Sequence, residues 1–261
     1  MKKHLSGWQD NFTMEDIQKW CGEHSKPWKV SIRKHIQDNG YKSVLDVGAG
    51  ACSEYYGFKD DAYEISYAAT EITPKYVEAA TKEGIDITLS DMKKLPFPDN
   101  QFDCCICSDV MTHQLEYEES IGEMLRVARK EVIITFFKPF LEDTVFGEQV
   151  TIDAADTSDP SATHTRIGDT SLVVAIGQPF MYPPDAHTSG KYPVIGTPLG
   201  ALEKRVSNDA GETICIYHFF HKGKFIEYLD TLNVQYTFEP QAENHEKTTL
   251  FLTKKDPEVI A

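Results

Sequence analysis

The chain has 261 residues, 41% of them hydrophobic, and a formal net charge of -15. This length and apolar content suffice for one large domain, or for one domain with a sizeable insertion. The excess of negative charge argues against a nucleic-acid partner, because phosphate backbones are held by clustered Lys and Arg. No stretch approaches the roughly 20 apolar residues of a membrane span, and the N-terminus lacks the apolar segment of a signal peptide. We therefore expect a cytoplasmic protein with no membrane partner.

Two helices are predicted before the first strand. Thr13 begins the first of them as an N-terminal cap that is followed by acidic residues. The second helix begins near Pro27, because proline is favoured at the first helical position, and it ends at Asn39-Gly40.

A buried strand over residues 44–47 then breaks abruptly into Gly48-Ala49-Gly50. Alternating glycines are typical of a ligand-binding turn, because they adopt positive φ angles and let the backbone come close to a ligand. Asp46 precedes them near the carboxyl end of the strand, where open α/β sheets bind their ligands.

Strands and helices alternate beyond this turn. Strands are predicted over residues 66–70, 85–89, 104–107 and 132–137, and helices from Thr73-Pro74 and over residues 118–128. Such alternation is typical of a doubly wound parallel sheet. Glu71 ends one of these strands, at the distance past the first glycine where such folds place a carboxylate against ribose hydroxyls.

The cysteines lack the spacing of a disulfide framework. Cys104, Cys105 and Cys107 crowd into one apolar run, and Cys104-x-x-Cys107 has the spacing of a metal or redox pair. No second pair or suitably spaced His follows, so we interpret them as core residues of a strand and expect no metal.

The alternation stops beyond Lys138. The segment over residues 139–208 is rich in proline, with residues 170–176 as its best strand candidate, and it is longer than an ordinary loop. We interpret it as an inserted lid or substrate-recognition element. Aromatic and polar residues cluster at 180–187, which fits an acceptor pocket, a homodimer contact or a self-packed loop. Strands over 213–219, 234–238 and 248–253 follow, with a helix over 222–232.

The order of these features resembles the class I S-adenosylmethionine-dependent methyltransferases, and most of all their small-molecule branch of ubiquinone and menaquinone biosynthesis methyltransferases. The landmarks are residues 44–50, Glu71, Ser90-Asp91-Met92, residues 95–99, Phe102-Asp103 and Glu123-x-x-Arg126-Val127. Together they cover about residues 40–137.

The resemblance implies an α/β fold whose mostly parallel, seven-stranded, Rossmann-like sheet ends in a C-terminal antiparallel hairpin. It divides the chain into an N-terminal helical cap over the cofactor site (1–40), the cofactor-binding half of the domain (41–138), the insertion (139–208) and the C-terminal completion of the sheet (209–261).

The resemblance also assigns roles to single residues, with S-adenosylmethionine as the cofactor. It implies that Asp46, Gly48 and Gly50 hold the methionine part of the cofactor, Glu71 the ribose hydroxyls, Asp91 the adenine amino group and Met92 the adenine ring, that Ser108 borders the reactive methyl group, and that Ala49 and Ile72 complete the set. The family often has a third glycine where this chain has Cys52, which leaves the shape of the turn open.

Two residues are candidates for a catalytic base. His113 follows the strand over 104–107, where class I enzymes place acceptor-side residues, and imidazole takes a proton near neutral pH. Packing or capping of the next helix explains His113 equally well, and Asp109 is the second candidate. The implied acceptor is a small molecule that is methylated on O, N or C, and an amine would need no strong base.

Two other functions compete with this one. A nicotinamide-dependent oxidoreductase would need glycine at the position of Ser53, and Asp46 would oppose its pyrophosphate. A non-catalytic S-adenosylmethionine-binding module on the same fold is the other alternative, because a fold does not guarantee a reaction.

Overall fold

The computed structural model describes residues 15, 18, 22–114, 116–137, 140–141, 163–167, 170–174, 194–196, 201–207, 213–240 and 247–255. Of the helix predicted from Thr13, residues 15 and 18 are described and both are helical. The cluster at 180–187 lies outside these ranges. The chain forms two compact units. The core unit comprises residues 12–111, 116–138 and 231–261, and the insert unit comprises residues 1–11, 112–115 and 139–230.

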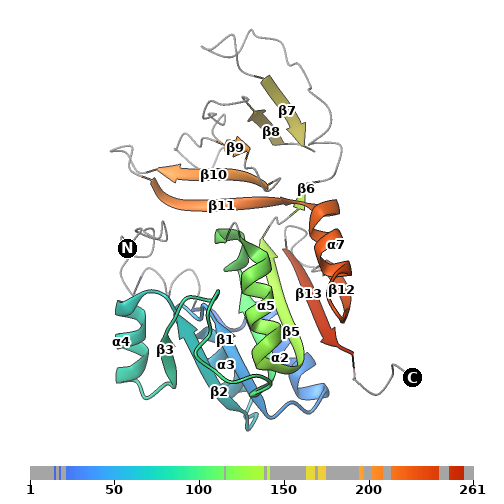
Figure 1. Ribbon diagram of the computed structural model, residues 1–261. Helices are drawn as coiled ribbons and strands as arrows, with labels where there is room; N and C mark the ends of the chain where they lie inside the picture. Colours follow the sequence, from blue (N-terminus) through green and yellow to red (C-terminus); the bar gives the residue numbers. More distant parts are fainter. Residues whose placement is uncertain are drawn as a thin grey trace, which may run out of the picture. The chain divides into compact units, whose positions relative to one another are not determined.

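A seven-stranded sheet in the order β12-β13-β5-β4-β1-β2-β3 organises the core unit (Figure 1). Its strands are β1 (Ser43–Val47), β2 (Ser66–Glu71), β3 (Ile87–Leu89), β4 (Phe102–Ser108), β5 (Ala128–Phe137), β12 (Val234–Pro240) and β13 (Lys247–Lys254). The first five pair in parallel, whereas β13 is antiparallel to both β5 and β12. The expected fold class, including the C-terminal hairpin, is confirmed.

In the core unit, four helices whose bounds the structure describes accompany this sheet. They are α2 (Pro27–Asp38), α3 (Ser53–Asp60), α4 (Pro74–Lys82) and α5 (Tyr117–Val127). Proline occupies the start of α2 and α4, where its missing N–H is not needed. Figure 1 shows α5 across one face of the sheet, with α2 and α3 on the opposite face.

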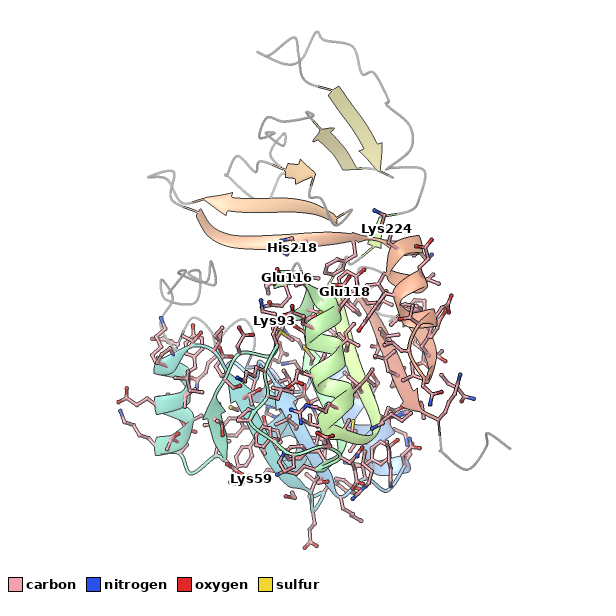
Figure 2. The ribbon with its side chains drawn as sticks, in the orientation of Figure 1. Lys59, Lys93, Glu116, Glu118, His218 and Lys224 are labelled. Carbon is pink, nitrogen blue, oxygen red and sulfur yellow. The ribbon has the colours of Figure 1, made fainter. Side chains whose placement is uncertain are left out.

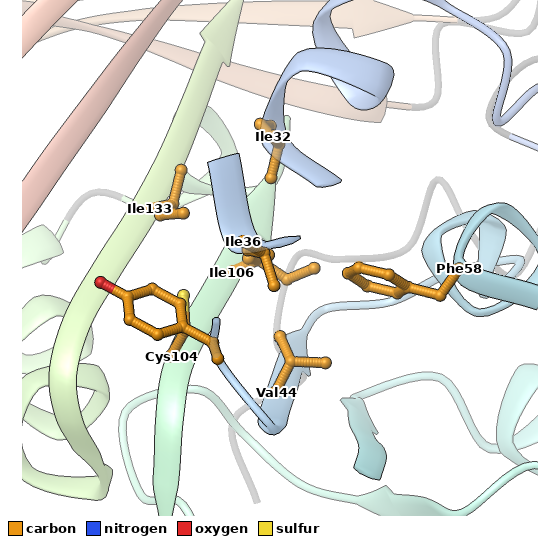
Figure 3. Packing of buried hydrophobic residues seen from close by; sticks show 8 residues of the cluster. Ile32, Ile36, Val44, Phe58, Cys104, Ile106 and Ile133 are labelled. Atoms are coloured by element: carbon orange, nitrogen blue, oxygen red, sulfur yellow. The ribbon is translucent and has the colours of Figure 1, made fainter. Parts of the chain in front are cut away.

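The core beneath α2 and α3 is apolar and closely packed (Figure 3). It contains Ile32, Ile36, Tyr41, Val44, Phe58, Cys104, Ile106 and Ile133. Cys104, Cys105 and Cys107 are buried free thiols, and burial raises the pKa of each. Because side chains alternate along a strand, Cys104 and Cys107 point to opposite faces of the sheet, as expected for core residues.

The insert unit contains a second, smaller sheet. Its four strands follow the order β6 (Phe140–Leu141), β11 (Thr213–His221), β10 (Ala201–Ser207) and β9 (Val194–Gly196), and a separate hairpin joins β7 (Thr163–Ile167) to β8 (Thr170–Val174). Helix α7 (Lys222–Asp230) follows β11. Residues 209–261 were expected to complete the main sheet. β12 and β13 do so, whereas β11 pairs with β10 and β6.

Among the described residues, no helix has both the length and the apolar character needed to cross a membrane.

Candidate cofactor site and its surroundings

The turn after β1 requires glycine at Gly48. Its φ angle is +75°, and a Cβ atom there would lie 2.8 Å from Cγ2 of Val110. Gly50 also has a positive φ angle, +53°, but nothing lies within 4 Å of the position that a Cβ would take. The backbone N–H groups of Gly48 and Ala49 donate to the carbonyl of Thr70 at 2.9 and 3.0 Å. The turn is thus fixed to β2 and leaves open space at Gly50.

Cys52 keeps the backbone conformation of a glycine. It precedes α3 with a φ angle of +54°, which costs an L-residue about 1–2 kcal/mol. Its side chain is buried against Ala80 and Ile85, and this packing offsets the cost. Burial and the charges of Asp46 and Glu71 raise the pKa of the thiol to about 12, so Cys52 fills space as an uncharged thiol.

The carboxylate of Glu71 is fixed by three backbone N–H groups. Oε2 accepts from Gly50 at 3.0 Å, and Oε1 accepts from Ile72 and Thr73, each at 2.9 Å. Two carboxylate oxygens offer about four lone-pair sites, so Oε2 can accept one further hydrogen bond beside Gly50. A sugar hydroxyl fits this remaining capacity.

Asp46 is a second buried carboxyl group under the turn. It is 3% exposed, and its Oδ2 accepts a hydrogen bond of 2.8 Å from the hydroxyl of Tyr67. Burial, followed by the charge of Glu54, raises the pKa of Asp46 to about 7, although the Tyr67 hydrogen bond and the charge of Lys29 act in the opposite direction. A cation bound nearby would favour the ionised form.

Side chains of helix α2 form hydrogen bonds with helix α3, which follows the turn. Arg33, 1% exposed, donates from Nη1 to Glu54 at 3.1 Å and from Nε to Asp61 at 2.7 Å. These partners lie at the two ends of α3. Between them, a Cβ on Gly57 would lie 2.4 Å from the guanidinium carbon of Arg33. Lys29, one turn earlier on α2, donates to the hydroxyl of Ser53 at the start of α3.

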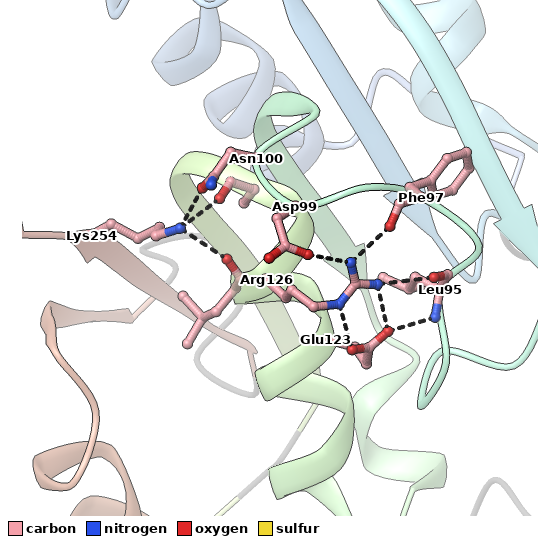
Figure 4. A network of polar contacts seen from close by, with 9 residues as sticks. Leu95, Phe97, Asp99, Asn100, Glu123, Arg126 and Lys254 are labelled. Carbon is pink, nitrogen blue, oxygen red and sulfur yellow. Dashed lines mark hydrogen bonds and ion pairs between the residues drawn. The ribbon is translucent and has the colours of Figure 1, made fainter.

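The motif Glu123-x-x-Arg126 holds the loop over residues 95–99 (Figure 4). The Arg126 guanidinium donates to both oxygens of Glu123 at 2.7 and 2.8 Å, and to the carbonyls of Leu95 and Phe97 at 3.0 and 2.7 Å. Glu123 in turn accepts from the Leu95 N–H at 2.8 Å. The motif is therefore a structural clamp on the chain that follows Asp91.

Asp91 and Met92 stand between this loop and Glu71. The N–H of Ser90 donates to the carbonyl of Glu71 at 3.0 Å, which joins the two segments. Asp91 accepts from the Lys93 N–H at 2.9 Å, and Met92 is buried. Lys93 pairs with Glu116 at 2.7 Å, and both side chains are labelled in Figure 2.

The end of β4 and the residues that follow it also adjoin the turn, through Val110. The Ser108 hydroxyl is buried and has no hydrogen-bond partner among the residues that the structure describes. Asp109 has a φ angle of +60°, and its N–H donates to the carbonyl of Thr135 at 3.1 Å. Val110 follows and packs against Gly48.

His113 is the other residue predicted as a catalytic base. It ends the 3-10 helix Met111–His113 and is half-buried. His113 belongs to the insert unit, whereas Asp109 belongs to the core unit.

The side chains that support the turn were not predicted from the sequence, namely Lys29, Arg33, Glu54 and Tyr67. Helix α3 was also missed. A usable signal was present, since acidic Glu54 follows Ser53 directly after the turn and Phe58 lies one turn later, as expected for a short amphipathic helix.

Comparison with known proteins identifies the domain. Residues 45–136 match the family model described as "Methyltransferase domain". The Bacillus subtilis (strain 168) protein named "Uncharacterized methyltransferase YcgJ" is 28% identical over 115 residues, which are 41% of this chain and 45% of that protein. The match thus spans less than half the length of this curated relative.

Solved structures share the fold along most of the chain. S-adenosylmethionine-bound CalS10 from Micromonospora echinaspora, an amino pentose methyltransferase, has a TM-score of 0.56 at 12% identity, with 94% of this chain and 98% of that chain covered. The Burkholderia thailandensis 1,6-didemethyltoxoflavin-N1-methyltransferase, solved with S-adenosylhomocysteine, has a TM-score of 0.50 at 14% identity, with 97% and 85% covered.

Residues 45–136 are thus similar in sequence to a methyltransferase domain, and most of the chain shares the fold of S-adenosylmethionine-dependent methyltransferases, in agreement with the resemblance found in the sequence. S-adenosylmethionine, the expected cofactor, is bound in the CalS10 structure.

Proposed function

We propose that this protein transfers the methyl group of S-adenosylmethionine to a small-molecule acceptor. The observation that carries the proposal is the joint geometry of Gly50 and Glu71. A buried carboxylate is fixed by the backbone of the turn, keeps one acceptor site, and lies beside a glycine with open space above it. This combination suits a ribose hydroxyl next to a closely approached backbone.

The remaining cofactor contacts are proposed from the same arrangement. Asp46 places a carboxylate under the turn for the positively charged methionine end, with Gly48 and Ala49 providing backbone contact. Glu71 and Ile72 border the ribose, while Asp91 and Met92 border the adenine. Ser108 lies on the side of the methyl group.

The bound cofactor supplies an electrophilic methyl group on a sulfonium. The protein's part is to hold the acceptor atom in line with that group, since alignment of two reactants supplies several kcal/mol of the barrier reduction. Asp109 and His113 are the candidates for removing a proton from the acceptor. Asp109 is the better supported of the two, because its neighbour Val110 touches the turn.

A small molecule is the proposed acceptor, because nothing in the net charge of -15 favours a nucleic acid. CalS10 and the toxoflavin enzyme, whose names give an amino pentose and a toxoflavin precursor as substrates, support this class. The methylated atom, O, N or C, is left to experiment.

Calorimetric titration with S-adenosylhomocysteine tests the cofactor assignment. Glu71→Gln replaces a carboxylate oxygen by an N–H₂ group that opposes backbone donors, and charged hydrogen bonds contribute about 1.5–3 kcal/mol each. We expect affinity to fall by roughly 10- to 100-fold. Glu78→Gln is the matched control, because Glu78 is exposed and pairs with Lys82 on the same helix.

Failure of the folded wild-type protein to bind either S-adenosylhomocysteine or S-adenosylmethionine would contradict the proposal. Titration with NAD tests the oxidoreductase alternative directly. A radiolabelled methyl-transfer screen over amines, alcohols and phenols separates an enzyme from a non-catalytic binding module.

A further inference from the structure

Tyr67 lies on β2, the strand that ends at Glu71, and bonds to the buried carboxyl group of Asp46 on β1. Its hydroxyl donates to Oδ2 of Asp46 at 2.8 Å. The two strands pair in parallel with Asp46 opposite Ala69, two residues beyond Tyr67. Because side chains alternate between the faces of a sheet, Tyr67 and Asp46 point to the same face, and the phenol extends along the sheet to the carboxyl group.

Packing fixes the position of the Tyr67 ring. The ring packs against the core beneath α2 and α3 and against the apolar residues beside Cys52. Its centre lies 5.5 Å from that of the Tyr55 ring, at an angle of 61°. Burial, followed by the charge of Asp46, raises the pKa of Tyr67 well above its usual range, so the hydroxyl keeps its proton and remains a donor.

The hydrogen bond from Tyr67 opposes the strongest influences on Asp46. Burial, followed by the charge of Glu54 on α3, disfavours the ionised carboxylate, and Glu71 acts in the same direction. The Tyr67 hydrogen bond and the charge of Lys29 on α2 favour it. The hydroxyl thus supports a negative charge that its surroundings would otherwise suppress.

Two thiols also face Asp46. They belong to Cys52 in the turn and Cys107 on β4, and burial, followed by the charge of Asp46, raises the pKa of both. Both thiols therefore stay uncharged near neutral pH.

The same hydrogen bond orients the Asp46 carboxyl group. It holds Oδ2 on the side of β2, which fixes the rotation of the group about the bond to its Cβ. Glu71, four residues beyond Tyr67, accepts from the Gly50 N–H at 3.0 Å. One strand thus sets the positions of both carboxyl groups that are proposed to bind the methionine and ribose parts of the cofactor.

We propose that Tyr67 is a positioning residue for cofactor binding, whose hydroxyl orients the Asp46 carboxylate beneath the turn and supports its negative charge. Tyr67 acts through Asp46 and not by touching the cofactor. This inference rests on the proposed methyltransferase function and adds to it a residue outside the glycine turn.

Calorimetric titration of Tyr67→Phe with S-adenosylhomocysteine, at pH values from 5.5 to 8.5, tests the inference. The substitution removes the hydroxyl and keeps the ring. A hydrogen bond to a charged group contributes more than one to a neutral group, so the pH at which affinity rises should move upward by about one pH unit. Affinity should fall by about tenfold at pH 6, but by only about two- to threefold at pH 8.5, where Asp46 is ionised in both proteins. Titration of the ligand itself is common to both proteins and cancels.

A double-mutant cycle shows whether Tyr67 acts through Asp46. In the Asp46→Asn background there is no carboxylate charge to support, so Tyr67→Phe should change affinity by less than about twofold at either pH. A purely structural role for Tyr67 would instead weaken binding equally at both pH values and in both backgrounds.

Tyr63→Phe is the matched control. It also removes one tyrosine hydroxyl from the core unit, but this hydroxyl donates to the backbone carbonyl of Tyr41 at 2.6 Å. We expect it to lower the urea midpoint and to leave the affinity and its pH profile unchanged. Circular dichroism establishes that each variant is folded.

Replacement of Tyr67 by 3-fluorotyrosine provides a second test that nearly preserves the shape of the side chain. Fluorine makes the hydroxyl a stronger donor, so the pH at which affinity rises should move downward, opposite to the shift in Tyr67→Phe. The inference is overturned if Tyr67→Phe has the same effect at pH 6 and pH 8.5, if its effect persists in Asp46→Asn, or if 3-fluorotyrosine leaves the profile in place. Failure of wild type to bind S-adenosylhomocysteine at any pH would instead contradict the proposed function.

Discussion

Substituting alanine at Gly48 and at Gly50 separates the two tasks of the glycine turn, stability and ligand approach. Both positions have positive φ angles, +75° and +53°, which cost an alanine about 1–2 kcal/mol each. At Gly48 the new Cβ would also lie 2.8 Å from the Val110 side chain, and overpacking adds about 1–3 kcal/mol. We therefore expect Gly48→Ala to lower the free energy of unfolding by about 2–5 kcal/mol.

Gly50→Ala has no such clash, because nothing lies within 4 Å of the added Cβ. Its strain is partly offset by the lower entropy of the unfolded chain, so a loss of about 1 kcal/mol is expected. The new methyl group instead enters the space where the cofactor is proposed to lie. Gly50→Ala should thus weaken S-adenosylhomocysteine binding by more than tenfold, a loss of more than about 1.4 kcal/mol.

Urea unfolding and calorimetric titration of both variants provide the comparison. Val110→Ala in the Gly48→Ala background should recover the steric part of the stability loss but not the part due to φ. The reasoning is refuted if Gly48→Ala and Gly50→Ala lose equal stability, or if Gly50→Ala binds S-adenosylhomocysteine as tightly as wild type.

Three other predictions follow from buried or clamped charges. Arg126→Lys keeps the charge but loses the planar fork to Glu123 and two carbonyls, so we expect a loss of about 2 kcal/mol in urea unfolding; an unchanged midpoint would contradict the clamp. The pKa of Asp46 is raised to about 7, so its carboxyl group must lose a proton before its negative charge can favour binding of the cationic cofactor. Affinity for S-adenosylmethionine should rise by about tenfold between pH 6 and 8 in wild type, and an equal rise in Asp46→Asn would rule out this carboxyl group as the cause. The Glu131 hydrogen bond, the largest of the causes, raises the pKa of His35, so the stability it contributes is present below about pH 6.5 and is lost as pH rises through the higher folded pKa. Between pH 5.5 and pH 8.5 the urea midpoint should therefore fall further in wild type than in His35→Gln. An equal fall in the two proteins would refute this.

The parallel half of the sheet was predictable because its strands are apolar runs bounded by turn residues. Boundaries were harder to predict where polar residues continue an element. β5 was predicted from Val132 but begins at Ala128, directly after α5. Three charged residues follow Ala128, yet Ala128 lies opposite Phe102 on β4 and Glu131 lies opposite Cys104. Local periodicity does not show such pairing, because the partner strand supplies it.

Two elements that depend on long-range contacts were not predicted. Helix α3 is short and contains Gly57, which weakens a helix interior, but the buried Arg33 side chain requires that glycine and binds both helix ends. β10 has only Leu202 and Val206 as large apolar residues, a spacing of four that does not indicate a strand. It is nevertheless paired along its length with β11.

The candidate site shows the same division between local and distant information. Gly48, Gly50 and Glu71 follow from strand ends and turn chemistry, and in the structure the Glu71 carboxylate accepts from the Gly50 N–H. The contact between Lys247 and Asp109 crosses 138 residues of sequence, so no motif spacing reveals it.

Helix α2 contacts both β13 and α3 through neighbouring side chains. Its successive residues Trp28 and Lys29 contact different partners, the indole lying under Lys247 and the ammonium bonding to Ser53. Arg33, one turn further on, binds both ends of α3 and is itself buried. Because these side chains lie on one helix, a displacement of α2 would move the Trp28 indole and the start of α3 together. The expected role of the N-terminal segment as a cap over the cofactor stays a prediction. In the part of that segment that the structure describes, the charged side chains of α2 contact both ends of α3.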